Sequence, residues 1–226
     1  MNQQDEIIVR PIPTSDAKPW IVRRHYAKRM CPISYAYGAF RDGELVGIVT
    51  YGTPSSPTLR TGVCGPEWAP HVVELNRLCC ESVKNLASIL VGRSLRLLPQ
   101  PTIVVSYADT AQGHVGYVYQ ATNFLYTGLS LKNIEYRLKS NPQAHGTTIT
   151  DKGRGHPNPI TWLRQTHGDD FYTVPRPQKH RYVHFCGDRR QCVAMRGSLR
   201  YPIMSYPKGE SMRYQIEVQP KAAGIA

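Results

Sequence analysis

The densest group of chemically capable side chains lies in the run S-Y-A-D-T-A-Q-G-H, from Ser106 to His114. This run begins at the end of a continuous apolar stretch, Ile103–Ala108, which is typical of a buried central strand. Open α/β sheets bind ligands at the carboxyl ends of such strands. Asp109 is placed there as a general base, a metal ligand or the cap of the next helix. The density of polar groups favours function, and the candidate cofactor-binding side chains are Ser106, Tyr107, Gln112 and His114.

A second group is the basic run R-R-H-Y-A-K-R, Arg23–Arg29. It ends a helix that we expect to be capped by Ser15, with Pro19 near its first turn. One interpretation is a solvated basic helix end, with His25 favourably placed at the C-terminal dipole. The other is a phosphate-contacting helix end that presents His25 and Tyr26 to a site. The candidate nucleic-acid contacts of this run are Arg23, Arg24, Lys28 and Arg29.

A third group is E-L-N-R-L, Glu74–Leu78, inside a predicted strand. Leu75 and Arg77 share one face of that strand. An arginine among apolar neighbours is costly unless a carboxylate or phosphate pairs with it. Arg77 is therefore a candidate for binding a ligand phosphate, with a structural ion pair as the alternative.

The elements that must position these groups predict an α/β fold with a mixed central sheet flanked by helices. Asp42-Gly43 between two β-rich runs is a strong hairpin signal. Residues 52–71 are rich in turn-forming residues and predict a long loop. The other predicted strands are Ile7–Val9, Val72–Leu78, Ile103–Ala108 and Leu125–Leu131, and the predicted helices are Leu86–Leu98, capped by Asn85, and Val115–Thr122.

Charge is concentrated in the last third of the chain. The net charge is +12, and residues 151–226 carry 13 basic and 6 acidic side chains. Clustered cations favour a polyanion such as nucleic acid. We expect a catalytic core over 1–140, a mobile loop over 141–160, and a basic C-terminal extension over 161–226 packed on the core. Its strand and basic helix supply the candidate nucleic-acid contacts Lys179, Arg181, Arg189 and Arg190.

Other features narrow the class of protein. The six cysteines show no CxxC zinc pair and predict no disulfide framework in a chain without a secretion signal. No apolar run approaches the roughly 20 residues of a membrane span. We therefore expect a cytoplasmic protein with no membrane partner.

Taken together, these stretches resemble one family, Mom, the DNA adenine-modification proteins of Mu-like phages. The resemblance covers most of residues 20–210. It rests on Arg24–Tyr26, Tyr35–Phe40, Asp42–Gly47, Gly52–Ser56, Glu74–Leu78, Ser106–Tyr119, Lys179–Val183, Leu199–Pro202 and Tyr206–Gly209.

The resemblance implies a GNAT acyltransferase-like fold and conversion of DNA adenine to N6-carbamoylmethyl-adenine (acetamidoadenine), which protects phage DNA from host restriction. It implies a catalytic set of His25, Tyr26, Arg77, Asp109 and Tyr119, joined by a tyrosine of the Tyr35/Tyr37 strand, for which we take Tyr37. It also implies double-stranded DNA as partner, with the target adenine flipped out of the stack.

The resemblance does not fix the chemical identity of the group donor. An acyl-CoA or another small donor is implied, and iron is associated with the family, with His25 and Asp109 as its candidate ligands. The usual pyrophosphate-binding signature of the GNAT fold, Q/R-x-x-G-x-G/A, is absent, and the nearest stretch is Val91–Ser94. The product also needs an N–CH2 bond, which plain acetyl transfer does not make. Two alternatives remain: a GNAT-type N-acyltransferase acting on another substrate, and a non-catalytic DNA-binding protein.

Overall fold

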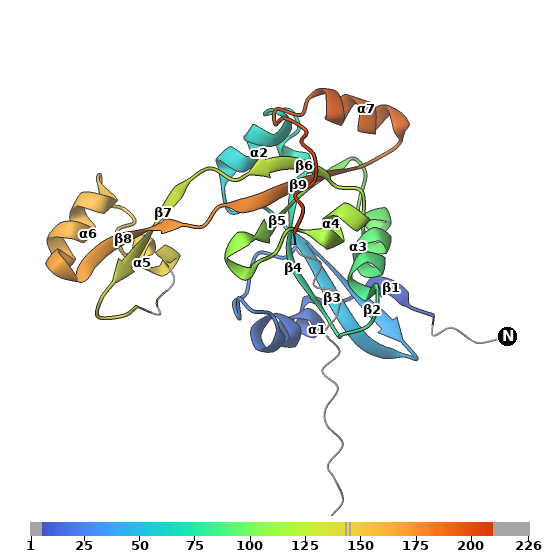
Figure 1. Cartoon of the computed structure of the whole chain (residues 1–226), viewed down its shortest axis with the longest axis horizontal. Helices are drawn as coiled ribbons and strands as arrows, with labels where there is room; N and C mark the ends of the chain where they lie inside the picture. Colours follow the sequence, from blue (N-terminus) through green and yellow to red (C-terminus); the bar gives the residue numbers. More distant parts are fainter. Residues whose placement is uncertain (1–5, 143, 145, 210–226) are drawn as a thin grey trace, which may run out of the picture.

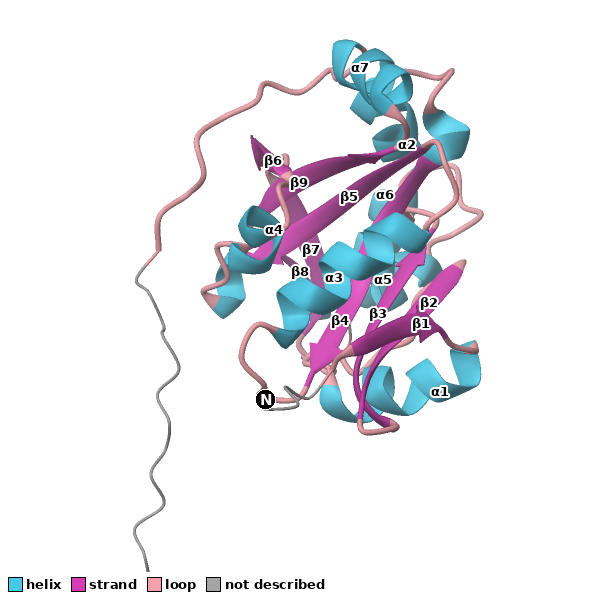
Figure 2. Cartoon of the chain, turned by 90° about the vertical axis from the view of Figure 1, so that its right-hand side faces the viewer, coloured by secondary structure: helices cyan, strands magenta, loops and turns pink. Residues whose placement is uncertain are grey.

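A computed structural model describes residues 6–142, 144 and 146–209 of the chain. Its centre is a seven-stranded sheet in the order β1-β2-β3-β4-β5-β9-β6. All neighbours are antiparallel except β4 and β5, which are parallel. The mixed sheet flanked by helices is therefore confirmed (Figures 1 and 2). Its strands are β1 (Ile8–Pro11), β2 (Tyr35–Arg41), β3 (Glu44–Gly52), β4 (Val72–Cys80), β5 (Thr102–Asp109), β6 (Leu125–Leu129) and β9 (Lys179–Cys186).

The helices cover both faces of this sheet because the strands carry apolar side chains on both faces. On one face, α3 (Leu86–Leu97) and α4 (Tyr117–Ala121) cover a core that includes Tyr51, Leu90 and Tyr182. The opposite face carries a second cluster around Val105 and Met195, packed with α2 (Pro57–Cys64) and α7 (Arg189–Gly197). A third cluster forms under α1 (Thr14–Pro19) and the π-helical turn η1 (Trp20–Arg24).

Local sequence explains the tight connections. Asp42 and Gly43 have φ values of 52° and 82°, as the predicted hairpin turn between β2 and β3 requires. At Gly52, a Cβ would lie 1.9 Å from the carbonyl oxygen of Pro32, so only glycine fits between β3 and that loop. Among the described residues, no helix is both long and apolar enough to cross a membrane.

Several predicted local features were wrong. Ser15 lies inside α1, whose N-cap is Pro13, and Pro19 ends that helix. Asn85 does occupy the predicted N-cap position of α3, but its backbone is left-handed with φ 60° and its side chain makes no cap hydrogen bond. The predicted loop over 52–71 holds α2, which Ser56 caps by accepting from the Leu59 N–H, and the 3-10 turn η2 (Ala69–His71).

The chain between β6 and β9 differs most from expectation. Residues 141–160, expected as a loop, contain α5 (Gly146–Lys152) and the start of α6 (Pro159–His167). These helices pack on a two-stranded sheet of β7 (Asn133–Leu138) and β8 (Phe171–Arg176). The turn η4 (Gly168–Asp170) connects α6 to β8. Figure 1 shows this unit projecting from the central sheet. The expected C-terminal extension is likewise divided, since β9 lies inside the central sheet between β5 and β6.

Candidate functional site

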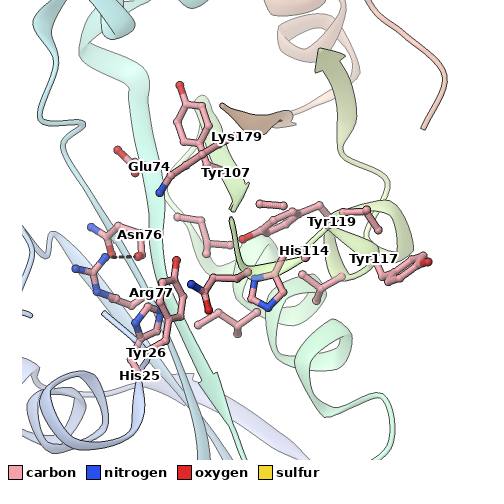
Figure 3. A pocket seen from close by; sticks show the side chains of 18 of the residues that line it. His25, Tyr26, Glu74, Asn76, Arg77, Tyr107, His114, Tyr117, Tyr119 and Lys179 are labelled. Atoms are coloured by element: carbon pink, nitrogen blue, oxygen red, sulfur yellow. Dashed lines mark hydrogen bonds between the residues drawn. The ribbon is translucent and has the colours of Figure 1, made fainter. Parts of the chain in front are cut away.

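A split between two neighbouring strands creates a large cavity. Parallel pairing of β4 with β5 joins Val72–Leu75 to Ile103–Ser106. Beyond these positions β4 continues against β3, and β5 continues against β9. A cavity of about 780 Å³ lies at this divergence (Figure 3). Its walls come from the helix end at His25, from β4, from the β5–α4 connection, and from the start of β9.

Most of the predicted catalytic and cofactor-binding residues meet in this cavity. Three segments that are far apart in the sequence converge on it. The predicted residues that line it are His25, Tyr26, Arg77, Tyr107, Gln112, His114, Tyr119 and Lys179.

His25 follows η1 and is only 8% exposed. Its Nδ1 accepts a hydrogen bond from the Ala27 N–H at 3.1 Å, which assigns the ring proton to Nε2. Burial, reinforced by the charges of Arg77 and His114, lowers the pKa of His25 to about 4. His25 is therefore a neutral imidazole at pH 7, a hydrogen-bond donor through Nε2 and a weak base.

Tyr26 presents an aromatic face at the cavity. Its ring stacks on His25 with centroids 4.4 Å apart and meets His114 edge-on at 6.2 Å. Tyr26 is 54% exposed, so one side of this stack is open. Partial burial and the nearby Asp109 raise the pKa of Tyr26, which keeps its hydroxyl protonated at neutral pH.

Arg77 lines the cavity and also connects two segments of the chain. Its guanidinium donates to the carbonyl of Arg29 through Nη2 at 2.9 Å and Nε at 3.3 Å, and to that of Asn76 at 2.6 Å. These bonds tie the segment that follows His25 to β4. The structural ion pair is not observed among the described residues, since the hydrogen-bond partners of Arg77 are backbone carbonyls rather than a carboxylate. Binding of a ligand phosphate by Arg77 stays a prediction.

Tyr119 and Ser106 form the buried floor. Tyr119 packs between Phe124 and Tyr182, and burial raises its pKa to about 12 despite a hydrogen bond with Ser106. The Ser106 hydroxyl also donates to the carbonyl of Leu75 at 3.1 Å, where pairing of β4 with β5 ends. Ser106 is fully buried and supports the floor rather than lining the cavity.

Asp109 lies beside the cavity and its carboxylate is engaged. One oxygen accepts a hydrogen bond from the Ala111 N–H at 3.0 Å, so Asp109 caps the turn that follows β5. Helix capping was one of the three roles that the sequence suggested for Asp109. The other oxygen lies 3.0 Å from Nζ of Lys179. Asp109 therefore holds Lys179 against the cavity wall.

Sequence reasoning missed Glu74 as a site residue. Glu74 lines the cavity near Tyr107 and Lys179 (Figure 3). Burial raises the pKa of its carboxyl, against the lowering effects of Lys179, Arg77 and Arg176. Within the described part of the chain, its carboxylate has no hydrogen-bond or ion-pair partner at all. Strand alternation hid this residue, because it places Glu74 and Arg77 on opposite faces. In the structure the β3–β4 register shifts between Leu75 and Arg77, which interrupts the alternation, and both residues line the cavity.

Two predicted site residues lie elsewhere. Tyr37 is 3% exposed in the core, where its hydroxyl donates to the Leu97 carbonyl at 3.0 Å and its ring meets Tyr51 edge-on. Arg181 is buried, bonds to Thr127 through Nε and Nη2, and stacks over the Tyr201 ring at 3.4 Å. Both are structural residues, so placing Tyr37 in the catalytic set and Arg181 among the nucleic-acid contacts was wrong.

The remaining candidate nucleic-acid contacts form two separate groups. Arg23, Lys28 and Arg29 are exposed next to the cavity residues His25 and Tyr26. Arg24 is exposed too, but it pairs with Glu81 at 3.3 Å and stacks on Trp20. Arg189 and Arg190 lie on the first turn of α7, beyond the end of β9 that is far from Lys179.

The residues do not fit the expected iron site. Nδ1 of His25 and both oxygens of Asp109 already have protein partners. Across residues 6–142, 144 and 146–209, no three or more His, Cys, Asp or Glu side chains come together as metal ligands. We derive no chemical step through iron.

The C-terminal end of the described chain completes the cavity. After α7 it crosses β6, where the Met204 N–H donates to Tyr126 and the Tyr206 hydroxyl donates to Phe124. Gln120 then bonds to Pro207, and Gly209 forms part of the cavity wall.

The sequence model of the Mom protein family matches residues 6–208. The chain belongs to the Mom protein family. It is also 27% identical over 210 residues to the methylcarbamoylase Mom of Escherichia phage Mu, an alignment that covers 90% of this chain and 84% of that protein. The family match spans the central sheet, the projecting unit and all of the cavity-lining residues of this Mom-family chain except Gly209.

Solved structures similar to this Mom-family fold include two acetyltransferases. One is an N-acetyltransferase from Staphylococcus aureus, with 11% identity, a TM-score of 0.42, and coverage of 80% of this chain and 99% of the other. The second is a Bacillus subtilis acetyltransferase in complex with CoA, with 11% identity, a TM-score of 0.38, and coverage of 80% and 99%.

Proposed function

We propose that this chain is a transferase that modifies adenine in DNA, forming N6-carbamoylmethyl-adenine in the cytoplasm of a phage-infected host and thereby protecting phage DNA from restriction. The observation that carries the proposal is the convergence of the Mom-like segments around His25, Arg77 and Tyr119 on one cavity. The relative in phage Mu is named a methylcarbamoylase, which supports a transferred group of this class.

The cavity offers a place for a flipped base. The open face of the Tyr26–His25 stack is an aromatic platform of the kind on which nucleobases stack. His25, which is 8% exposed, supports this platform from the other face of the Tyr26 ring. Arg23, Lys28 and Arg29, next to this platform, are candidate contacts for the phosphates of the displaced nucleotide.

The split strands offer a place for the donor. Where β4 leaves β5, the residues Asn76 to Leu78 line the cavity, and an extended amide-containing chain can bind along such a strand edge as an added strand does. An acyl-CoA arm has this chemistry, so an acyl-CoA is the donor class that we propose for this cavity. Attack of N6 on its thioester carbon would release a thiolate but would form an amide. The carbamoylmethyl product therefore requires that the donor present a CH2 carbon that carries a leaving group, so that the N–CH2 bond forms as the bond to that group breaks.

Glu74 is our candidate for the proton acceptor. As the bond to N6 forms, the amine must lose a proton to a nearby base. The Glu74 carboxylate is unpaired within the described residues and its pKa is raised, whereas both oxygens of Asp109 are engaged. Asp109 and Lys179 then act as positioning residues for the cavity wall.

Two assays separate these claims. Intact-nucleoside mass spectrometry of DNA from expressing cells should reveal a heavier deoxyadenosine with the mass of the carbamoylmethyl adduct; unmodified DNA from folded protein in a host that supplies the donor opposes the function. For the base, Glu74→Gln should lower the rate about 10²–10⁴-fold and remove the acidic limb of the pH–rate profile. Asp109→Asn, the matched control, should keep that limb, and the reverse pattern would assign the base to Asp109.

A further inference from the structure

The unit between β6 and β9 folds separately from the central sheet. We call residues 131–178 the arm. Its core is made by Leu138, Ile149, Leu163 and Phe171, which are at most 9% exposed, and its strands and helices pack mainly on one another. Such an insertion is not needed to complete the central sheet, because β6 and β9 pair directly.

The arm leaves from the rim of the cavity. Ser130 N–H donates to the Lys179 carbonyl at 2.8 Å, and Lys179 N–H donates to Oγ of Ser130 at 2.9 Å. Gln178 bonds to the carbonyl of Ser130, and Thr110, next to Asp109, bonds to the carbonyl of Gln178. Since Lys179 lines the cavity, these bonds fix the root of the arm beside it.

The arm carries positive charge that it does not neutralise itself. Three of its carboxylates have partners: Glu135 pairs with Arg137 at 3.2 Å, Asp151 pairs with Arg154 at 2.6 Å, and Asp170 accepts two hydrogen bonds from Ser140. Asp169 is left over. Against it stand five exposed cations that have no carboxylate partner within the described residues: Lys132, Lys139, Lys152, Arg164 and Arg176.

The shape of the arm suits duplex DNA. β7 and β8 pair over six residues each, a ribbon of about 20 Å at the usual rise per residue. The major groove of B-DNA admits a two-stranded ribbon, and clustered cations replace the counterions of its phosphates. A ribbon of this length, with the cations Lys152 and Arg164 on the helices packed against it, can span a groove and reach both of its backbones.

We infer that the arm is a DNA-holding element, which grips the duplex through phosphate contacts and keeps it against the cavity in which one adenine is modified. The inference rests on the proposed function for the identity of the duplex. It moves the main DNA contact away from α7, where the sequence placed Arg189 and Arg190.

The test is the salt dependence of binding, measured by fluorescence anisotropy of a labelled DNA duplex with the full chain. The triple variant Lys139→Ala, Lys152→Ala and Arg164→Ala should lower the slope of log affinity against log salt by about 2–3 and raise Kd roughly tenfold or more. The matched controls are the triple Arg41→Ala, Lys84→Ala and Arg96→Ala, outside the arm, and a charge-keeping variant, Lys139→Arg, Lys152→Arg and Arg164→Lys. Both should bind like the wild type.

Each outcome decides the inference. An unchanged slope in the folded arm triple, or an equal loss in the control triple, overturns it. Tighter binding of an RNA duplex with the same dependence on the arm overturns DNA as the occupant. If the slope falls as expected but cellular DNA stays unmodified, the arm stands and the proposed function fails; modified DNA with an unchanged slope gives the reverse result.

Discussion

Lowering the pH from 7 to 5 should destabilise the fold through His25. In the unfolded chain this side chain has a pKa near 6.5, whereas in the fold its pKa is about 4. At pH 7 the ring is neutral in both states. As the pH falls through 6.5 the unfolded state gains a proton that the folded state does not, so stability is lost between pH 6.5 and 4.

The size of this effect follows from the two pKa values. At pH 5 the unfolded state is almost fully protonated at this site and the folded state is mostly neutral, which lowers the free energy of unfolding by about 2 kcal/mol. Burial is the principal cause, since His25 is 8% exposed and the electrostatic effects of Arg77 and His114 only add to it.

Urea unfolding of the wild type and of His25→Gln at both pH values isolates the contribution. Burial also lowers the pKa values of His180 and His184, but both proteins keep these residues. The wild type should therefore lose about 2 kcal/mol more than the variant on going from pH 7 to pH 5. An equal loss in the two proteins would show that His25 is freely protonated in the fold, and the neutral donor assigned to it would be wrong.

Three further predictions concern residues that the structure reassigns or explains. Tyr37→Phe removes the hydrogen bond to the Leu97 carbonyl and should cost about 1 kcal/mol in chemical denaturation with unchanged activity, whereas a catalytic Tyr37 would lose activity at constant stability. Arg181→Ala should cost about 2–4 kcal/mol, because it leaves buried Thr127 groups unpaired and removes the stack on Tyr201; a fully stable variant with weaker DNA binding would restore the original assignment. Asp188→Ala breaks the capping box of α7 and should cost about 1 kcal/mol in a thermal melt, which Asp188→Asn should largely restore; a melt unchanged by the alanine variant would mean that this helix end does not limit stability.

The strands that build the site could be predicted because their signals are local. Asp42-Gly43 requires a backbone that few residues adopt, and Ile103–Ala108 is a run of apolar residues long enough only for a buried strand. The grouping of Arg77 with Tyr119 in one site came instead from the resemblance to the Mom family. The arm had no comparable signal, because the strand at Asn133–Leu138 is half-polar and finds its partner only after two helices.

The chemistry of individual site residues depends on contacts that spacing does not encode. Arg77 was expected to bind an anion, but the spacing gave no sign of its hydrogen bonds to the backbone carbonyls of Arg29 and Asn76. Asp109 and Glu74 are both carboxylates at the cavity, but only the tertiary fold gives Asp109 a lysine partner and leaves Glu74 without one among the described residues. Tyr37 and Tyr119 were both predicted as site tyrosines. Only the packing of the helices decides that Tyr119 reaches the cavity and Tyr37 does not.

Photo-crosslinking tests most directly whether adenine enters this cavity. A DNA duplex that carries 8-azidoadenine at a modified position would be irradiated with the full chain, and the adducts would be mapped by peptide mass spectrometry. The account predicts adducts on the cavity residues, Tyr26 and Tyr119 above all, and their loss when unlabelled DNA competes. Adducts confined to α7 or to other surfaces outside the cavity, with none on its walls, would contradict it.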